Sequence, residues 1–392
     1  MKVLVAMSGG VDSSVAAALV REAGHEAVGV FMRLGSPDEK LDEPVEICDL
    51  PPAATKRTHK QGCCSVGDAA DARAVAAELG IPLYVCNFRN DFRRIIDYFV
   101  EEYAGGRTPN PCVRCNDWLK FGKLHGYAKR LGCDAVASGH YARVAEVDGE
   151  RGREWAMLRG ADAGKDQSYV LFGVPRGQLG ETMLPIGGYE TKQEVRDLAE
   201  RFGLPTFDKP DSQEICFVPG QDYAGFIERE RPGLVSSGAI LTRDGTPVGE
   251  HRGQHRFTIG QRRGLGLSQV GEDGGPVYVV EKDPARNAVI VGSGEDLLAG
   301  SLVAAEANWL VDAWDGWREV LVQHRYNSAA VPGRVRIVEP MDVPNHSGRS
   351  GAFEVVFDEA QRAVTAGQAV VLFEGDRVLG GGWIARVGGP AG

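Results

Sequence analysis

One short stretch near the start of the chain constrains the fold most strongly. Residues 2–7 form an apolar run, Ser8-Gly9-Gly10 interrupts it, and residues 12–20 then read as an alanine-rich helix. A buried strand, a glycine turn and a helix in direct succession are typical of the first unit of a parallel α/β sheet. The two glycines let backbone N–H groups approach phosphate oxygens, Ser13 and Ser14 add hydroxyl donors, and the helix N-terminus favours an anion. The Ser8–Ser14 loop is therefore predicted to bind phosphate, although it lacks the Walker A pattern.

The alternation of strands and helices continues through the N-terminal half. Further strands are expected at 28–32, 82–86 and 135–137, and helices at 68–79, 92–103, 119–131 and 191–202. This order predicts a doubly wound parallel sheet with helices on both faces. Residues 35–62 are rich in proline and charged side chains, and they are expected to be an insertion of unknown role.

The pattern changes beyond about residue 230, where helical periodicity fades. Short Val/Ile-rich runs follow between Gly, Pro and Asn turns, at 276–281, 288–292, 333–338, 352–357 and 368–373. Several short strands at such spacing favour a barrel or a sandwich. We therefore expect three domains: an α/β catalytic domain over 1–225, a small central domain over 226–290 and a C-terminal β-barrel domain over 291–392.

Composition narrows the class of protein. The 392 residues include 44 Lys and Arg against 54 Asp and Glu, a net charge of −10, which does not indicate bulk nucleic-acid binding but leaves room for a local basic face. No apolar stretch reaches the roughly 18 residues of a membrane helix, and the N-terminal apolar run is too short for a signal peptide. A cytoplasmic protein without a membrane partner is expected, whose eight cysteines are reduced, catalytic or metal-binding.

Three of the cysteines stand in segments that suggest chemistry. Cys112 and Cys115 follow Pro109-Asn110-Pro111 and precede a helix with basic residues, a setting that lowers the pKa of a thiol. Half of a zinc site is the alternative, but a zinc site needs four ligands and Cys63-Cys64 is too tightly spaced to complete one. Cys216 follows a polar, proline-containing segment. Two thiols near a nucleotide site suit sulfur relay, in which one carries a persulfide and the other resolves it. A buried, inert Cys216 is the other interpretation.

The Ser8–Ser14 loop resembles the pyrophosphate loop of the PP-loop ATP pyrophosphatase superfamily, whose members cleave ATP between the α- and β-phosphates. Further segments make the chain similar to the tRNA-specific 2-thiouridylase family over essentially its whole length. These segments are 108–111, Cys115-Asn116, 138–141, 165–169, 212–217 and 258–264. The resemblance implies an ATP- and Mg²⁺-dependent tRNA-uridine 2-sulfurtransferase that converts the wobble uridine, at position 34 of tRNAs of the Lys, Glu and Gln type, to 2-thiouridine. It also implies a sulfur supply from a cysteine desulfurase or a sulfur-carrier protein.

The resemblance assigns roles to individual residues. It implies that Cys115 is the catalytic nucleophile and that Cys216 carries the persulfide, with a disulfide between them after sulfur transfer. The implied ATP contacts are Ala6, Met7, Ser8, Gly9, Gly10, Val11, Asp12, Ser13, Met32 and Gly139. The implied target-base loop is Asn110, Pro111 and Cys112, and the other implied tRNA contacts are His140, Lys165, Asp166, Gln167, Arg325, Tyr326 and Gln368.

The chain departs from some family members at Cys112, where those members have an aspartate proposed as a general base. Cys112, Cys115 and Cys216 could instead hold three irons of a 4Fe–4S cluster, so persulfide relay and cluster-bound sulfide both stay open. The loop alone also allows an amidotransferase-type synthetase, and a decayed loop would allow an RNA-binding protein without activity.

An RNA-binding face is expected from three further segments. Lys165–Gln167 form a loop before a strand-like run at 169–172, and Arg256, Arg262 and Arg263 cluster around a glycine-rich turn of the central, tRNA-binding domain. Residues 324–326 combine positive charge with a ring on which a base can stack. A wobble base must be turned out of its stack to reach an ATP site.

Overall fold

A parallel sheet organises the N-terminal part of the chain. The computed structural model describes residues 1–35, 66–149, 152–211, 215–218, 220, 222–267 and 275–389. It divides the chain into two compact units, which we call unit 1 (residues 1–93 and 115–221) and unit 2 (residues 94–114 and 222–392). The insertion expected at 35–62 lies outside the described residues after Gly35, as do Cys48, Cys63, Cys64 and residues 212–214.

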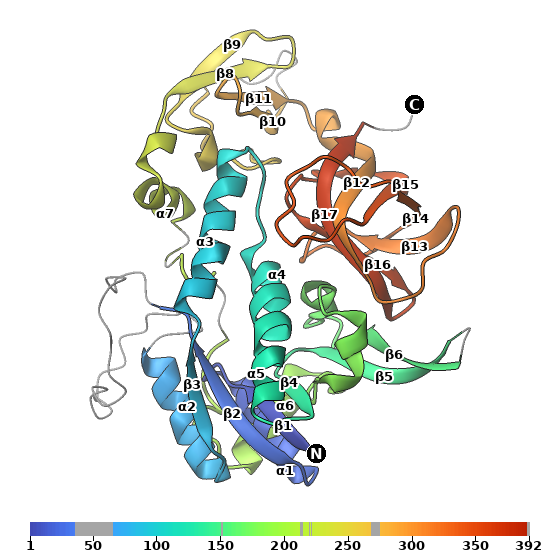
Figure 1. Cartoon of the computed structure of the whole chain (residues 1–392). Helices are drawn as coiled ribbons and strands as arrows, with labels where there is room; N and C mark the ends of the chain where they lie inside the picture. The colour runs from blue at the N-terminus through green and yellow to red at the C-terminus, as the bar shows by residue number, and fades with distance from the viewer. Residues whose placement is uncertain are drawn as a thin grey trace. The chain divides into compact units, whose positions relative to one another are not determined.

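Unit 1 contains five parallel strands in the order β3-β2-β1-β4-β7 (Figure 1). The strands are β1 (Lys2–Ala6), β2 (Glu26–Arg33), β3 (Leu83–Asn87), β4 (Ala135–Ser138) and β7 (Thr182–Met183). The helices are α1 (Val11–Glu22), α2 (Val66–Leu79), α5 (Leu124–Arg130) and α6 (Lys192–Arg201), with the start of α3 (Arg89–Ala104). The predicted α/β sheet is confirmed.

Both faces of this sheet are covered, because successive strand side chains point to opposite sides. Val3 and Val5 of β1 pack in one core with α1, α2 and α6. Leu4, between them, is also fully buried, and so is Val136 on β4. A sheet that buries both faces reads as a continuous apolar run, which is what residues 2–7 show.

Two predicted elements of unit 1 differ in the structure. The helix expected at 119–131 begins earlier: α4 (Pro111–Cys115) continues into a π-helix, η1 (Asn116–Lys123), and then into α5. The strand expected at 169–172 is wrong, because Ser168–Leu171 forms a 3₁₀ helix, η2. Its apolar run is buried, and periodicity alone does not separate a short buried helix from a strand. The hairpin of β5 (Ala142–Gly149) and β6 (Gly152–Arg159) was not predicted.

Unit 2 holds a small mixed sheet and a closed barrel. The small sheet has the order β10-β11-β8-β9 and its own apolar core. Six antiparallel strands form the barrel, which closes because β12 pairs with both β15 and β17. This confirms the predicted C-terminal β-barrel.

The elements of unit 2 are α7 (Tyr223–Glu230), β8 (Gly238–Thr242), β9 (Pro247–His251), β10 (Tyr278–Asp283), β11 (Ala288–Gly292), β12 (Leu298–Trp309), β13 (Arg318–Gln323), β14 (Val331–Val338), β15 (Ala352–Arg362), β16 (Ala369–Glu374) and β17 (Arg377–Gly388). Short 3₁₀ turns lie at Arg176–Glu181 in unit 1 and at Pro232–Leu234, Gln254–Arg256 and Glu295–Leu297 in unit 2. Within the described part of the chain, no helix is long and apolar enough to cross a membrane.

Candidate functional site

The Ser8–Ser14 loop connects β1 to α1 and is shaped by its glycines and hydroxyls. Gly9 has a φ of +73°, and a Cβ there would lie 2.2 Å from the Asp68 carbonyl oxygen, so only glycine fits. Gly10 is the N-cap of α1, and its carbonyl accepts hydrogen bonds from the Ser13 and Ser14 hydroxyls at 3.0 and 2.8 Å. The two hydroxyls thus stabilise the loop itself, and the N-terminus of α1 is left as the element that favours an anion.

The other predicted ATP contacts lie at the same edge of the sheet. Ala6 at the end of β1 aligns with Val30 on β2 and with Ser138 on β4. Met32 lies near the end of β2, and Gly139 directly follows β4. A Cβ on Gly139 would lie 2.5 Å from the Asp12 carbonyl carbon, so β4 and the loop meet closely. The carboxyl edge of a parallel sheet, between strands whose connections diverge, is where such folds bind ligands.

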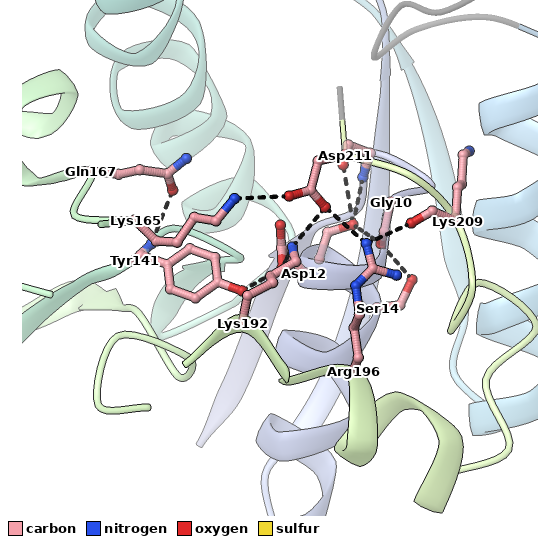
Figure 2. A network of polar contacts seen from close by, with 12 residues as sticks. Gly10, Asp12, Ser14, Tyr141, Lys165, Gln167, Lys192, Arg196, Lys209 and Asp211 are labelled. Atoms are coloured by element: carbon pink, nitrogen blue, oxygen red, sulfur yellow. Dashed lines mark hydrogen bonds and ion pairs between the residues drawn. The ribbon is translucent and has the colours of Figure 1, made fainter. Parts of the chain in front are cut away.

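A polar network surrounds Asp12 of the loop (Figure 2). The Asp12 carboxylate accepts from the Tyr141 hydroxyl at 2.8 Å and from Lys192 Nζ at 2.5 Å. Burial, and secondly the Asp12 charge, raise the pKa of Tyr141, which therefore stays a protonated donor. Thr191 caps α6 by accepting from the Glu194 N–H, and this fixes Lys192 in the first turn facing the loop.

Asp211 is a second carboxylate in this network. It is held by three cations of unit 1: Lys165 at 3.1 Å, Lys192 at 3.1 Å and Arg196 at 3.2 Å. Burial raises the pKa of Asp211, but the hydrogen bonds and charges of Lys192 and Lys165 outweigh burial, and the net shift is downward. Asp211 is therefore ionised at neutral pH.

Lys209 contacts the loop from the opposite side of the network. Its Nζ donates to the Gly9 carbonyl at 2.9 Å and to the carboxylates of Asp68 and Asp71 at 2.7 and 2.6 Å. Lys192, Arg196 and Lys209 were not predicted as residues of this site. The alternating charges and proline of residues 208–211 were a signal for Lys209 only. Ammonium groups held by carboxylates can exchange them for phosphate oxygens, so the network is suited to a polyphosphate.

The predicted thiols lie on or near helices. Cys112 is exposed and Cys115 half-buried in α4, whose first turn is capped by the Asn110 side chain, accepting from the Val113 N–H at 3.3 Å. The π-helix begins directly after Cys115; such turns are frequent at functional sites. Cys216 is half-buried, and the ring of the next residue, Phe217, packs edge-on against Phe92 with centroids 5.5 Å apart.

A metal centre was one of the alternatives for the predicted cysteines. Within the described residues, no group of three or more His, Cys, Asp or Glu side chains is placed to hold a metal ion. The cluster alternative for Cys112, Cys115 and Cys216 and the zinc alternative for Cys112 and Cys115 therefore stay predictions. Mg²⁺ poses a different question, because it is usually bound by one or two carboxylates together with substrate phosphates. Asp12 is the carboxylate that the loop offers.

Two of the predicted tRNA contacts of unit 1 form hydrogen bonds with other groups of the protein. The Asp166 carboxylate accepts from the Gly160 and Ser168 N–H groups at 2.9 and 3.0 Å and pairs with Arg159 at 3.0 Å, so it organises its own loop. Gln167 accepts from the Tyr141 N–H at 3.0 Å.

His140 is buried in unit 1. Its Nδ1 lies 2.8 Å from the Ser138 hydroxyl, and its Nε2 lies 3.5 Å from Lys120 Nζ. Burial, and secondly the Lys120 charge, lower the pKa of His140 far below its ordinary value. His140 is therefore neutral at pH 7, so its side chain can take part in hydrogen bonds but carries no charge.

The predicted tRNA contacts of unit 2 lie at two separate positions in the chain. Arg325 and Tyr326 lie in the turn after β13, where Gln323 donates to both of their carbonyls at 3.2 and 2.9 Å. Tyr326 is 40% exposed. Gln368 donates to the Thr108 and Pro109 carbonyls at 2.9 and 3.2 Å. Gln368 thus holds the loop that leads into Asn110, Pro111 and Cys112.

One of the three arginines expected to form a basic cluster in the central domain is paired with a carboxylate. Arg256 forms an ion pair with Glu228, whereas Arg262 and Arg263 are exposed in the glycine-rich turn. Of the three expected arginines, Arg262 and Arg263 are therefore the two exposed ones for which no ion pair is seen among the described residues.

Family models cover nearly the whole chain. The model described as "tRNA methyl transferase HUP domain" matches residues 1–220, "tRNA methyl transferase PRC-barrel domain" matches 225–293, and "Aminomethyltransferase beta-barrel domain" matches 299–384. The methyl transfer in these descriptions does not occur in the names of the curated relatives that follow.

Several curated relatives are similar over their full length, and each is named tRNA-specific 2-thiouridylase MnmA. The protein of Rhodopirellula baltica is 45% identical, with 98% of this chain and 96% of the relative covered. That of Geobacter metallireducens is 46% identical, with 98% and 96% covered. That of Moorella thermoacetica is 46% identical, with 98% and 99% covered.

Proposed function

This chain belongs to the tRNA-specific 2-thiouridylase family, and we propose that it thiolates the wobble uridine of tRNA by adenylating O2 and then transferring persulfide sulfur. The observation that carries the proposal is the loop at the carboxyl edge of the sheet, where Asp12, Lys192 and Lys209 meet the N-terminus of α1. Family membership argues against the two rivals, an amidotransferase-type synthetase and an RNA-binding protein without activity.

The first step is adenylation at the Ser8–Ser14 loop. The uridine O2 attacks the α-phosphorus of ATP, the bond to the bridging oxygen breaks and pyrophosphate leaves. N3 loses its proton to water in this step and takes one up from water when the sulfur has replaced O2. The helix N-terminus and the lysines stabilise the charge that gathers on the departing pyrophosphate. Mg²⁺, held by the phosphates with Asp12, would neutralise part of that charge. Adenylation turns O2 into a good leaving group, AMP.

The second step is sulfur transfer through the two half-buried thiols of unit 1. The terminal sulfur of a Cys216 persulfide attacks C2, and AMP leaves with O2. The Cys115 thiolate then attacks the Cys216 sulfur, breaks the S–S bond and leaves the transferred sulfur on C2. A Cys115–Cys216 disulfide results, and a dithiol reductant must reduce it before the next turnover.

The remaining assignments belong to the same proposal. Residues 1–225 form the catalytic domain, 226–290 the central tRNA-binding domain and 291–392 the barrel domain. Asn110, Pro111 and Cys112 receive the target base, with Cys112 in the position of the aspartate of other members. The sulfur supplier is a cysteine desulfurase or a carrier protein, and the tRNAs are those of the Lys, Glu and Gln type. The chain works in the cytoplasm.

Radiolabelled sulfur transfer tests this function. The chain is incubated with unmodified tRNA, ATP, and persulfide generated from ³⁵S-cysteine by a cysteine desulfurase. We expect Cys216→Ser to abolish labelled 2-thiouridine while ATP binding, measured by calorimetry, stays at the wild-type level. Cys86→Ser is the matched control, because Cys86 is also half-buried in unit 1. Full thiolation by Cys216→Ser would refute the assignment of the persulfide carrier.

A further inference from the structure

A fully buried ion pair lies beside the predicted thiols. Arg114 stands in α4 between Cys112 and Cys115, and only 1% of its side chain is exposed. Its two terminal nitrogens donate to the two carboxylate oxygens of Glu306, each at 2.8 Å, and the Glu306 side chain is 2% exposed. This is the bidentate geometry in which arginine fixes both distance and orientation.

The Glu306 side of the pair is held by the barrel. Glu306 belongs to β12, and its carboxylate also accepts from the His346 and Ser347 N–H groups at 3.1 and 2.9 Å. Its backbone has a φ of +52°, in the left-handed region that residues other than glycine rarely adopt. Such strain persists only where the surroundings over-determine the conformation, and it is most common at functional sites.

Aromatic rings enclose the Arg114 guanidinium. Its central carbon lies 3.7 Å from the ring centroid of Trp383 and 4.9 Å from that of Tyr98. The Tyr98 hydroxyl accepts from the Asn110 N–H at 3.3 Å. The same cluster therefore contacts both α4 and the first residue of the target-base loop.

Stability alone does not explain this arrangement. Desolvating two charges costs nearly as much as their attraction returns, so apolar residues of similar volume would stabilise the core as well. A bidentate pair, unlike an apolar contact, fixes one register. We propose that Arg114 and Glu306 are positioning residues for thiolation: their ion pair holds the part of α4 that carries Cys112, together with the target-base loop, in one orientation on the C-terminal barrel. This inference rests on the proposed function and gives the barrel a part in holding the target-base loop.

Steady-state kinetics with matched variants, in the presence of a dithiol reductant, test the inference. Glu306→Gln keeps the size of the side chain and one of its two backbone hydrogen bonds, but it removes the charge and replaces one acceptor oxygen by an NH₂ donor. Arg114→Met removes the cation at similar length. We expect both to lower kcat for thiolation by about tenfold or more, with KM for ATP within about twofold of wild type. Arg114→Lys keeps the cation but loses the fork, and we expect it to recover part of the loss.

A stability control separates positioning from folding. Leu372→Ala creates a cavity in the fully buried core of the same barrel, and Leu372 takes part in none of the hydrogen bonds or ring contacts described for the pair. At a temperature where all variants are folded by circular dichroism, we expect Leu372→Ala to keep the wild-type kcat. The inference is overturned if wild type thiolates tRNA and the folded Glu306→Gln enzyme has the same kcat. A wild-type enzyme that makes no 2-thiouridine would instead contradict the proposed function.

Discussion

Lys192 illustrates what a single side chain contributes to the candidate site. Its Nζ reaches Asp12 of the loop at 2.5 Å and Asp211 at 3.1 Å, although 180 residues separate it from Asp12. The loop was predictable from seven consecutive residues because its chemistry is local. For Lys192 the sequence predicted only that a helix begins there, because the sequence pattern does not show which residues pack against that helix.

Replacing Lys192 tests whether the network binds phosphate. Lys192→Met removes a charge-assisted donor, and we expect the dissociation constant for ATP to rise about tenfold or more. Arg201→Met is the matched control, because Arg201 lies on the same helix in a largely exposed pair with Glu22. Calorimetric titration measures both. Unchanged ATP affinity in Lys192→Met would exclude this lysine from the phosphate site.

His324 gives the barrel a defined dependence on pH. Burial, and secondly the Arg325 charge, lower the pKa of His324 from 6.5 to about 4. The unfolded chain therefore takes up a proton at a higher pH than the folded chain, so stability falls as the pH drops from 6.5 towards 4. At about pH 5 this one group costs the folded state about 2 kcal/mol.

Urea unfolding at neutral pH and at pH 5 measures this contribution. We expect the unfolding free energy of wild type to fall by about 2 kcal/mol more than that of His324→Gln over this interval. The other buried histidines titrate in both proteins and cancel in the comparison. Equal losses in the two proteins would show that His324 does not carry the effect.

Among the helices and strands, the apolar periodicity of the sequence predicted those whose buried residues follow a regular helix or strand pattern. β1, α1, α6 and β11 lie where the apolar periodicity places them. Strand β17 was not predicted, because Gly380-Gly381-Gly382 interrupts its apolar run. The structure explains this: a Cβ on Gly382 would lie 2.7 Å from the Ala305 carbonyl oxygen across the β12 pairing. Tight packing of neighbouring strands, which propensity does not encode, selects glycine there.

Gly139 tests how closely β4 must approach the loop. In Gly139→Ala the added methyl would lie 2.5 Å from the Asp12 carbonyl carbon and 2.6 Å from the Ser13 nitrogen, so the loop must shift. We expect ATP affinity to fall about tenfold, equal to about 1.4 kcal/mol, in a folded protein. Gly126→Ala in α5 is the control, since nothing lies within 4 Å of its added Cβ. Wild-type affinity in Gly139→Ala would show that the loop tolerates displacement.

For the whole molecule, the motif order predicted the family, the parallel sheet and the barrel. It did not predict which residues of the barrel contact the thiol-bearing helix. Arg114 and Glu306 are 192 positions apart, and an arginine between two cysteines reads as an ordinary basic residue near a helix start. Only the closed barrel brings β12 to this helix within unit 2. Partnerships of this kind depend on topology, so they cannot be read from local sequence.

ATP-dependent thiolation of the wobble uridine is tested by measuring the nucleoside content of tRNA after reaction with the purified chain. Unmodified tRNA, ATP and a persulfide donor are supplied, the tRNA is digested, and 2-thiouridine is quantified by mass spectrometry beside the AMP released. We expect 2-thiouridine only at the wobble position, only when ATP is present, and in proportion to the AMP released. Thiolation that proceeds without ATP, or ATP cleavage that leaves the wobble uridine unmodified, would contradict it.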